Sequence, residues 1–203
     1  MNNQKICIIG DGLTGLMAAI ILSKANIKID LYSDSKKKKI ADNRTTAISE
    51  SNYQYIKNNI NIKIQDFFWP CKKIDLFFED KGKIINFLNF EEKNKNFMYI
   101  FQNKDLKKKL GKLISKIKKI KIIKKSIKNI NKEEGFISFG KKKKFYDLII
   151  LSVGGRSKLY SSIEKGRSIE KNYEEVALTG IIKHNAKIKN ASQFFLKEGP
   201  LAI

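Results

Sequence analysis

The sequence is poor in cysteine and histidine, which build disulfides and metal sites, and in proline and tryptophan. It contains two cysteines, two prolines, one tryptophan and one histidine in 203 residues. Two cysteines without a spacing pattern predict neither a disulfide framework nor a metal site, and a single histidine cannot anchor a zinc ion. Cysteines used in this way are typical of a reducing compartment. We therefore expect no metal and a cytoplasmic location.

The sequence also lacks a long apolar run and a visible signal peptide. Its most apolar helical segment, residues 13–23, is too short to span a bilayer. Arginine is scarce as well, because only positions 44, 156 and 167 carry it among 42 basic residues. The net charge of +22 would ordinarily indicate nucleic acid, but specific readers of nucleic acid favour the arginine fork. We interpret the lysines as a compositional bias and expect no nucleic-acid partner.

The first thirty residues, by contrast, carry a specific pattern. An apolar strand over 5–9 runs into Gly10-Asp-Gly12-Leu-Thr-Gly15, an apolar helix follows directly, and a second strand is expected over 27–32. In this context Gly-x-Gly-x-x-Gly predicts a dinucleotide site, although an ordinary strand-to-helix turn is the alternative. Gly10 would permit the tight turn, Gly12 would let a diphosphate approach the backbone, and Gly15 would let the helix pack on the strand.

The acidic residue that usually binds the ribose hydroxyls is missing from its expected position at the end of the second strand. The position at the end of the second strand is Ser33, and Asp34 stands beside it. A serine hydroxyl makes only an uncharged contact with a ribose, whereas Asp34 would reach it if the strand end shifts. Asp30 lies three residues earlier and is expected to point elsewhere. This departure lowers the expected affinity for a dinucleotide.

The rest of the chain alternates helical and strand patterns. We expect helices over 50–58 and 104–119. Strands are expected over 73–79, 83–90, 120–130, 135–139, 145–151, 176–183 and 191–196. The helix over 104–119 has a regular apolar stripe and a lysine face, which favours packing on a sheet over binding to a membrane surface.

Four blocks resemble the flavin-dependent aromatic monooxygenases, and most closely the branch that hydroxylates polyprenyl-phenols in ubiquinone biosynthesis. The blocks are the glycine turn, Asp42-Asn-Arg44-Thr-Thr-Ala-Ile-Ser49, Tyr99-Ile-Phe-Gln102-Asn-Lys-Asp-Leu106, and Tyr173-Glu-Glu-Val-Ala177 followed by Ala191-Ser-Gln-Phe194 and Gly199-Pro-Leu-Ala202. The resemblance implies an α/β fold with a Rossmann-like FAD-binding domain and a partial mixed or antiparallel substrate-domain sheet. It assigns 1–66 and 97–166 to the first domain, and 67–96 and 167–203 to the second, which would be truncated at its C-terminus.

The resemblance also implies a reaction, namely hydroxylation of the aromatic ring of a ubiquinone precursor with FAD, NAD(P)H and O2. The flavin performs the oxygen chemistry, so no acid–base side chain is nominated. Arg44 would place its charge near the FAD diphosphate or ring system, and Gln102 would bind the cofactor from the start of the following helix. The expected cofactor-binding residues are Gly10, Gly12, Leu13, Thr14, Gly15, Ser33, Asp34, Arg44, Gln102 and Gly154. The implied partners are a polyprenyl-phenol substrate and either the inner-membrane surface, contacted peripherally, or a ubiquinone-biosynthesis complex.

Two departures leave alternatives open. The family carries Ala-Asp-Gly after its late apolar strand, whereas this chain has Ser152-Val153-Gly154, so the aspartate is missing. Family members are also about twice as long, on the usual relation of length to domain number. The chain is therefore a monooxygenase-type protein, a decayed or truncated dinucleotide-binding remnant without catalysis, or a basic module that binds a membrane surface.

Overall fold

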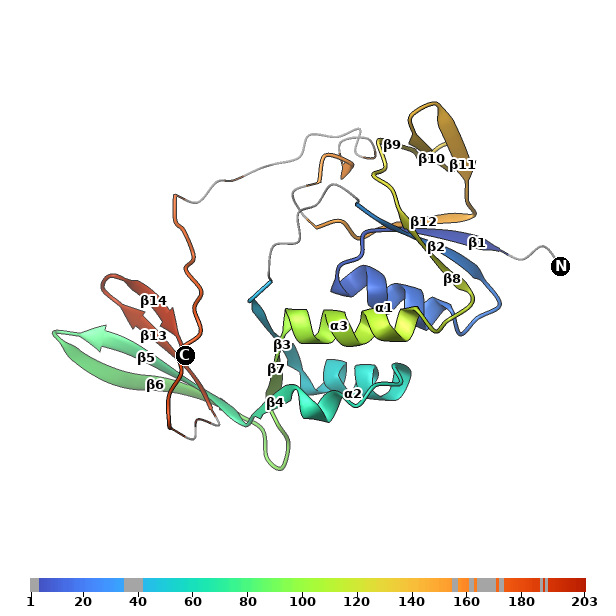
Figure 1. Ribbon diagram of the computed structural model, residues 1–203. Helices are drawn as coiled ribbons and strands as arrows, with labels where there is room; N and C mark the ends of the chain where they lie inside the picture. The colour runs from blue at the N-terminus through green and yellow to red at the C-terminus, as the bar shows by residue number, and fades with distance from the viewer. Residues whose placement is uncertain are drawn as a thin grey trace. The chain divides into compact units, whose positions relative to one another are not determined.

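The computed structural model describes residues 4–34, 42–154, 157–160, 163, 171, 174–186, 188 and 190–203. The chain divides into two compact units (Figure 1). Unit 1 comprises Met1–Asp42 and Leu106–Ala177, and unit 2 comprises Asn43–Asp105 and Leu178–Ile203. These are units of packing, and the functional domain boundaries expected from the sequence stay a prediction.

Unit 1 is built on a parallel sheet with the strand order β12-β1-β2-β8. The strands are β1 (Lys5–Ile9), β2 (Lys28–Ser33), β8 (Ile120–Lys124) and β12 (Leu148–Leu151). Ile9 pairs with Tyr32 on one side and with Leu151 on the other, so these three strands end at a common edge. Four consecutive residues of β1 are buried, as expected for a parallel strand that is covered on both faces.

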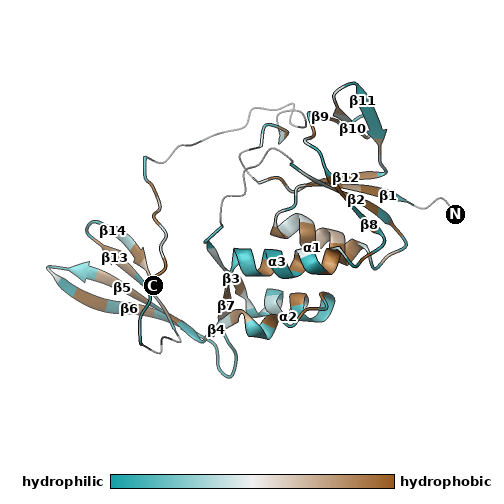
Figure 2. Cartoon of the chain, viewed as in Figure 1, coloured by the Kyte–Doolittle hydropathy of each residue, from teal (hydrophilic) through white to brown (hydrophobic). Residues whose placement is uncertain are grey.

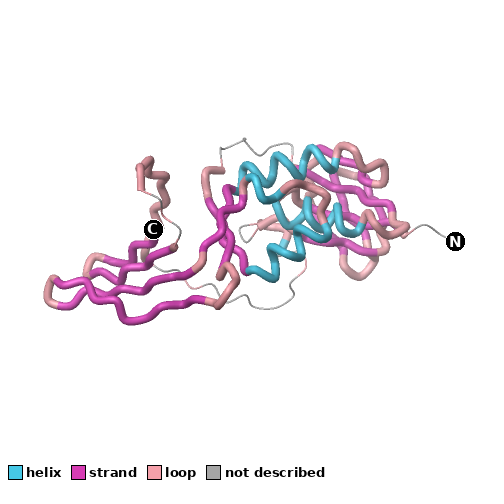
Figure 3. The backbone as a smooth tube through the Cα atoms, turned by 90° about the horizontal axis from the view of Figure 1, so that it is seen from below, coloured by secondary structure: helices cyan, strands magenta, loops and turns pink. Residues whose placement is uncertain are grey.

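Helices cover one face of this sheet. Figures 1 and 3 place α1 (Leu13–Leu22) and α3 (Asn103–Ile114) on the same side of the strands. In α1 the residues that turn toward the sheet are small or aliphatic, and Ala19 is fully buried. In α3 the apolar stripe of Leu106, Leu110 and Ile114 is at most 1% exposed. This burial confirms the core-packing interpretation of that helix.

A small antiparallel sheet covers the other face. It consists of β9 (Asn129–Asn131), β10 (Phe136–Phe139) and β11 (Lys142–Phe145), in the order β11-β10-β9. Its buried residues Ile130 and Ile137 pack in one cluster with Cys7 and Ile9 of β1. Side chains alternate along a strand, so Ile6 and Ile8 point to the opposite, helix-covered face. Unit 1 thus has three layers.

Unit 2 contains a three-stranded antiparallel sheet and a helix against it. The strands are β3 (Thr45–Ser49), β7 (Met98–Gln102) and β4 (Phe68–Cys71), with β7 in the centre. The helix α2 (Glu50–Asn59) is capped by Ser49, whose side chain accepts a hydrogen bond from the Asn52 N–H. Tyr53 of α2 stacks on Tyr99 of β7 with ring centroids 3.7 Å apart. A short 3-10 helix, η1 (Ile64–Asp66), follows α2.

The second sheet of unit 2 has the order β14-β13-β5-β6. The strands are β5 (Lys73–Asp80), β6 (Lys83–Glu91), β13 (Ala191–Leu196) and β14 (Gly199–Ala202). β13 runs parallel to β5, and the other neighbours are antiparallel. The β5–β6 turn has positive φ at Lys81 (47°) and Gly82 (77°), as a two-residue hairpin turn requires.

Several expected boundaries are wrong. The helix expected over 104–119 ends at Ile114, and the strand expected over 120–130 is two strands, β8 and β9. The run 145–151 is not one strand, because Phe145 ends β11 and β12 begins only at Leu148. Between them, the Asp147 carboxylate accepts a hydrogen bond from the Lys5 backbone N–H at 2.7 Å. β3, β4, β7, β11 and β14 were not expected from the sequence.

The strand expected over 176–183 is also absent, since residues 174–186 adopt no helix or strand. Among the described residues, no strand pairs with this segment, and a strand needs a neighbour to satisfy its backbone groups. No helix of the described residues is both long and apolar enough to cross a membrane.

Candidate functional site

The glycine turn between β1 and α1 is closely packed against the residue that follows β12. Gly10 has a φ of +116°, and a Cβ there would lie 2.3 Å from the Ser152 carbonyl oxygen. A Cβ on Gly15 would lie 2.0 Å from the Gly10 carbonyl oxygen and 2.6 Å from Ser152 Oγ. Both positions therefore exclude a side chain. The roles expected for Gly10 and Gly15, a tight turn and close helix packing, agree with this geometry.

Gly12 differs from the other two glycines, because the space beside it is open. Its φ of −71° is accessible to any residue, and a Cβ there would meet only the Ser152 carbonyl oxygen, at 4.0 Å. Gly12 caps α1 without a side-chain hydrogen bond, and no acidic residue lies in the first turn of that helix. Leu13 and Thr14 are the first residues of the helix. The turn thus offers uncapped backbone N–H groups and the positive end of a helix to an anion.

The residues of this turn fit a diphosphate. The helix end supplies donors, the missing side chain at Gly12 leaves access to them, and the packing at Gly10 and Gly15 fixes the loop. Ser152 holds the turn from the neighbouring strand, since its N–H donates to the Ile9 carbonyl at 2.8 Å and its hydroxyl donates to the same oxygen at 3.1 Å. No role was expected for Ser152 from the sequence. A small polar residue directly after an apolar strand is the only signal for it.

Ser33, Asp34 and Gly154 lie near the same edge of the parallel sheet. Ser33 ends β2 and pairs with Lys124 of β8. The Asp34 carboxylate accepts a hydrogen bond from the Ser126 hydroxyl. Gly154 follows β12 with a φ of +82°, which favours glycine. Gly155 and Arg156, which follow Gly154, and Tyr173, which opens the fourth motif block, lie outside the described residues.

Arg44 and Gln102 lie together in unit 2. The Arg44 carbonyl oxygen accepts a hydrogen bond from the Asn103 N–H at 3.0 Å, and Gln102 pairs with Thr45 across β3 and β7. Gln102 is the last residue of β7 rather than the first of a helix. The buried Asn103 side chain accepts a hydrogen bond from the Thr46 hydroxyl at 2.6 Å and so ties the start of α3 to β3. The Arg44 side chain is exposed.

A lysine side chain of α3 lies beside the glycine turn within unit 1. Lys107 Nζ of α3 lies 3.6 Å from Asp11 Oδ2, and both side chains are about half exposed. Asp11 is the variable residue between the first two glycines, so its carboxylate lies where it would oppose a bound diphosphate. Lys107 offsets that negative charge.

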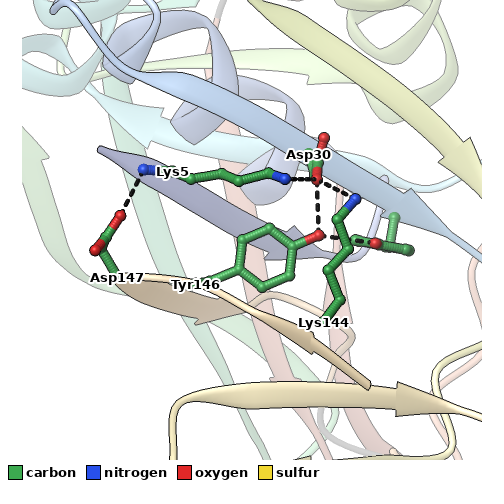
Figure 4. Close-up of polar contacts among 6 residues, drawn as sticks. Lys5, Asp30, Lys144, Tyr146 and Asp147 are labelled. Atoms are coloured by element: carbon green, nitrogen blue, oxygen red, sulfur yellow. Dashed lines mark hydrogen bonds and ion pairs between the residues drawn. The ribbon is translucent and has the colours of Figure 1, made fainter. Parts of the chain in front are cut away.

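A buried polar cluster at Asp30 was not expected to matter (Figure 4). Asp30 of β2 points toward Lys144 of β11 and toward Tyr146, which follows β11. Its Oδ2 lies 2.7 Å from Lys144 Nζ and 3.7 Å from Lys5 Nζ, and it accepts a hydrogen bond from the Tyr146 hydroxyl at 2.7 Å. The Tyr32 hydroxyl in turn donates to the Tyr146 oxygen at 2.8 Å.

The cluster shifts the titration of its members. Burial alone would raise the pKa of Asp30, but the hydrogen bonds from Lys144 and Tyr146 and the charges of Lys144 and Lys5 outweigh burial and hold this pKa below its ordinary value. Burial and the hydrogen bonds to Tyr32 and Asp30 raise the pKa of Tyr146. Burial, and then the Asp30 charge, raise the pKa of Cys7 to about 12, so this thiol stays protonated and unreactive. The cluster therefore has a structural role, because it connects β2 to β11 and to Tyr146.

The described residues contain no group of three or more His, Cys, Asp or Glu side chains that could hold a metal ion. Cys7 and Cys71 are both free and buried. The candidate site is therefore the anion-binding edge of unit 1.

No protein-family model matches the sequence, and no curated protein matches it. Solved structures do match its fold. The chain superposes on the 2,6-dihydroxypyridine-3-hydroxylase of Arthrobacter nicotinovorans with a TM-score of 0.69 and 15% identity, covering 99% of this chain and 51% of that one. The tetrameric form of 2-methyl-3-hydroxypyridine-5-carboxylic acid oxygenase gives 0.63 and 16%, with 80% and 43% covered. The p-nitrophenol 4-monooxygenase of Pseudomonas putida DLL-E4 gives 0.59 and 15%, with 79% and 43% covered.

At such identities the likeness shows the fold alone. The chain spans about half the length of these structures. The expected fold class is confirmed: a mixed α/β chain with a Rossmann-like parallel sheet and additional antiparallel sheets, which matches the fold of the hydroxylase, oxygenase and monooxygenase structures above.

Proposed function

We propose that the chain binds FAD and belongs to an aromatic-ring hydroxylase of the flavin-dependent monooxygenase type. The observation that carries the proposal is the glycine turn, where Gly10 and Gly15 are packed too closely for a side chain while Gly12 leaves the uncapped end of α1 open. The diphosphate would lie over the first turn of α1, at Gly12, Leu13 and Thr14.

The remaining residues have supporting roles. Ser152 holds the turn in place, and Ser33 and Asp34 lie at the edge where a ribose would lie. On the resemblance of their blocks alone, we propose that Arg44 would supply a permanent charge and Gln102 an amide to the cofactor. Bound FAD would supply the oxygen-transfer chemistry, and the chain's own residues would bind and orient it.

The finer proposal concerns the substrate and reductant. The resemblance of the Asp42–Ser49 and Tyr99–Leu106 blocks supports a polyprenyl-phenol precursor of ubiquinone as substrate, with NAD(P)H as reductant and O2 as oxidant. On the same ground we propose a cytoplasmic protein that contacts the inner-membrane surface or a ubiquinone-biosynthesis complex. The free, buried cysteines are compatible with a reducing compartment.

A dinucleotide-binding remnant without catalysis is the second candidate. Two observations favour it: the ribose position holds the uncharged Ser33, and Asp34 already binds Ser126. A membrane module based on the 104–119 helix has no such support, because the apolar stripe of α3 is buried.

An FAD titration followed by a turnover assay separates these candidates. The purified chain is mixed with FAD and followed by flavin absorbance, and then NAD(P)H and a phenol are added. A monooxygenase-type protein binds flavin and oxidises NAD(P)H in a phenol-dependent manner. Flavin uptake without NAD(P)H oxidation supports the remnant, and no flavin uptake contradicts both candidates.

A further inference from the structure

The positive charge of the chain is concentrated in one stretch of unit 1. Residues 106–145 contain sixteen lysines and two glutamates, and neither arginine nor aspartate, which gives a net charge of +14 out of +22. The other 163 residues together carry +8. A bias in composition alone would spread the charge along the chain, so the bias expected from the sequence does not account for this stretch.

The densest part of this stretch surrounds β8, the edge strand of the parallel sheet. Residues 116–128 contain seven lysines, five isoleucines and one serine, and no acidic residue. β8 pairs with β2 on one side, and no strand of the described residues pairs with it on the other. All seven lysines are exposed. Positive charge therefore lines this edge of the sheet.

The β10–β11 hairpin continues this charge. Lys125 Nζ lies 5.0 Å from the centre of the Phe139 ring, and Phe139 pairs with Lys142 of β11. Residues 141–143 are three exposed lysines, and Figure 2 shows β11 in the hydrophilic colour. We call the combined set the basic rim: Lys116, Lys118, Lys119, Lys121, Lys124, Lys125, Lys128, Lys141, Lys142 and Lys143.

Protection of a sheet edge does not account for the whole rim. Lysines on an edge strand discourage pairing with another chain, but of these ten only Lys121 and Lys124 belong to β8. The other eight lie in the connections before and after β8 and in the hairpin. Like charges within one unit repel each other, and an anionic partner would offset that repulsion.

Exposed apolar side chains lie among these lysines. Ile122 of β8, between Lys121 and Lys124, is 46% exposed. Phe145, the last residue of β11, is 59% exposed and follows Lys143 by two residues. A membrane interface takes up apolar side chains while lysine heads remain among the polar headgroups. A phosphate backbone offers nothing comparable to an isoleucine.

The side-chain chemistry also favours a lipid surface over nucleic acid. Arginine, whose planar fork binds bases and phosphates in a bidentate manner, is absent from residues 106–145. Single-stranded bases stack on exposed aromatic rings, but Phe136 is only 6% exposed and lies under Lys143 Nζ at 4.3 Å. An anionic bilayer requires only positive potential, and clusters of about four to eight lysines supply enough.

We infer that the basic rim of unit 1 binds an anionic phospholipid surface. The inference names a surface for the membrane contact of the proposed function, but it depends on charge and on exposed apolar side chains rather than on FAD. It also differs from a membrane module built on the apolar stripe of α3, because that stripe is buried. Vesicle binding and flavin binding are separate measurements, so failure of the inference is distinguishable from failure of the proposed function.

The test is sedimentation of the purified full chain with vesicles of phosphatidylcholine, with and without phosphatidylglycerol. We expect binding only to the anionic vesicles, and loss of binding as added salt screens the charges. The triple variant Lys118→Gln, Lys128→Gln, Lys142→Gln should bind about a hundredfold more weakly, because each lysine near an anionic surface contributes about fivefold. Arginine at the same three positions keeps the charge and should keep the affinity.

The matched control is Lys83→Gln, Lys93→Gln, Lys95→Gln, which removes the same charge from exposed positions of unit 2. Its affinity should stay within about threefold of the wild type, because charges outside the contact are screened. Circular dichroism should show that all variants are folded. No vesicle binding, equal binding to neutral vesicles, or equal losses in the two glutamine variants would overturn the inference. So would a single-stranded oligonucleotide that binds the same three lysines more tightly than the vesicles do.

Discussion

At the scale of single residues, packing excludes a side chain at two positions of the glycine turn, Gly10 and Gly15. Gly15→Ala places a Cβ 2.0 Å from a backbone oxygen that cannot move aside, so we expect it to lower the free energy of unfolding by about 3 kcal/mol. Gly111→Ala, in α3 with no atom within 4 Å of the added Cβ, should raise that free energy by about 0.5–1 kcal/mol. Urea unfolding of the two variants checks this contrast, and equal midpoints would contradict it.

Lys107 and Asp11 allow a second prediction at this scale. Lys107→Met leaves the Asp11 carboxylate unopposed beside the diphosphate site, so FAD affinity should fall about three- to tenfold. Asp11→Asn should restore most of this loss in the double variant if Lys107 acts only by offsetting Asp11. Lys108→Met, one residue along α3, is the control. Fluorescence titration at low and high salt measures the effects, and equal affinities for the two lysine variants would contradict the role of Lys107.

At the scale of elements, Asp30 joins β2 to the small sheet that covers it. Asp30→Asn removes the charge that holds Lys144 and Lys5, so we expect a loss of about 2 kcal/mol in the free energy of unfolding at pH 7. Asp80→Asn, at the exposed end of β5, should change the free energy of unfolding by less than about 0.5 kcal/mol. Equal losses in the two variants would show that the cluster does not hold the layers together.

The same carboxylate predicts a pH dependence. Its pKa is lower in the folded chain than in the unfolded chain, so its contribution to stability is present above the unfolded value near pH 4 and disappears as the pH falls through the folded value. The wild-type chain should therefore lose stability more steeply than Asp30→Asn between pH 5 and pH 2. Urea unfolding over that range measures both slopes, and parallel curves would contradict the assignment.

Elements with a local signal were predictable from the sequence. β1, α1 and β2 follow from an apolar run, a glycine turn and a second apolar run, and the β5–β6 hairpin follows from a turn that ends in Gly82. β3, β4 and β7 were missed because Thr45–Ser49 and Phe68–Cys71 are short and lie in sequences without clear alternation. β3 and β4 each pair with β7, which lies in a distant part of the sequence, so no local pattern reveals these pairings.

The candidate site was predictable to a similar extent. The three glycines could be assigned individual roles because each role depends on local backbone geometry. Ser152 could not be identified from the sequence, because its hydroxyl contacts Ile9 of β1, about 140 residues earlier in the chain. The cluster at Asp30 was missed for the same reason, because Lys144 and Tyr146 are far from Asp30 in the sequence.

At the scale of the whole molecule, the two units differ in how their sheets are covered. Unit 1 buries both faces of its parallel sheet. In the β14-β13-β5-β6 sheet of unit 2, five large apolar side chains are 40–49% exposed: Ile85, Phe87, Leu88, Phe90 and Phe195. Cofactor binding can be tested on unit 1 residues alone.

The most direct test of the central claim compares FAD binding by the wild-type chain and Gly12→Ala. Gly12 has an ordinary φ and open space beside it, so the substitution should change the free energy of unfolding by no more than about 1 kcal/mol. If a diphosphate occupies that space, the added methyl group should weaken FAD binding by at least about tenfold, a loss of 1.4 kcal/mol. A wild-type chain that binds no FAD, or a Gly12→Ala chain that binds it equally well, would contradict the account.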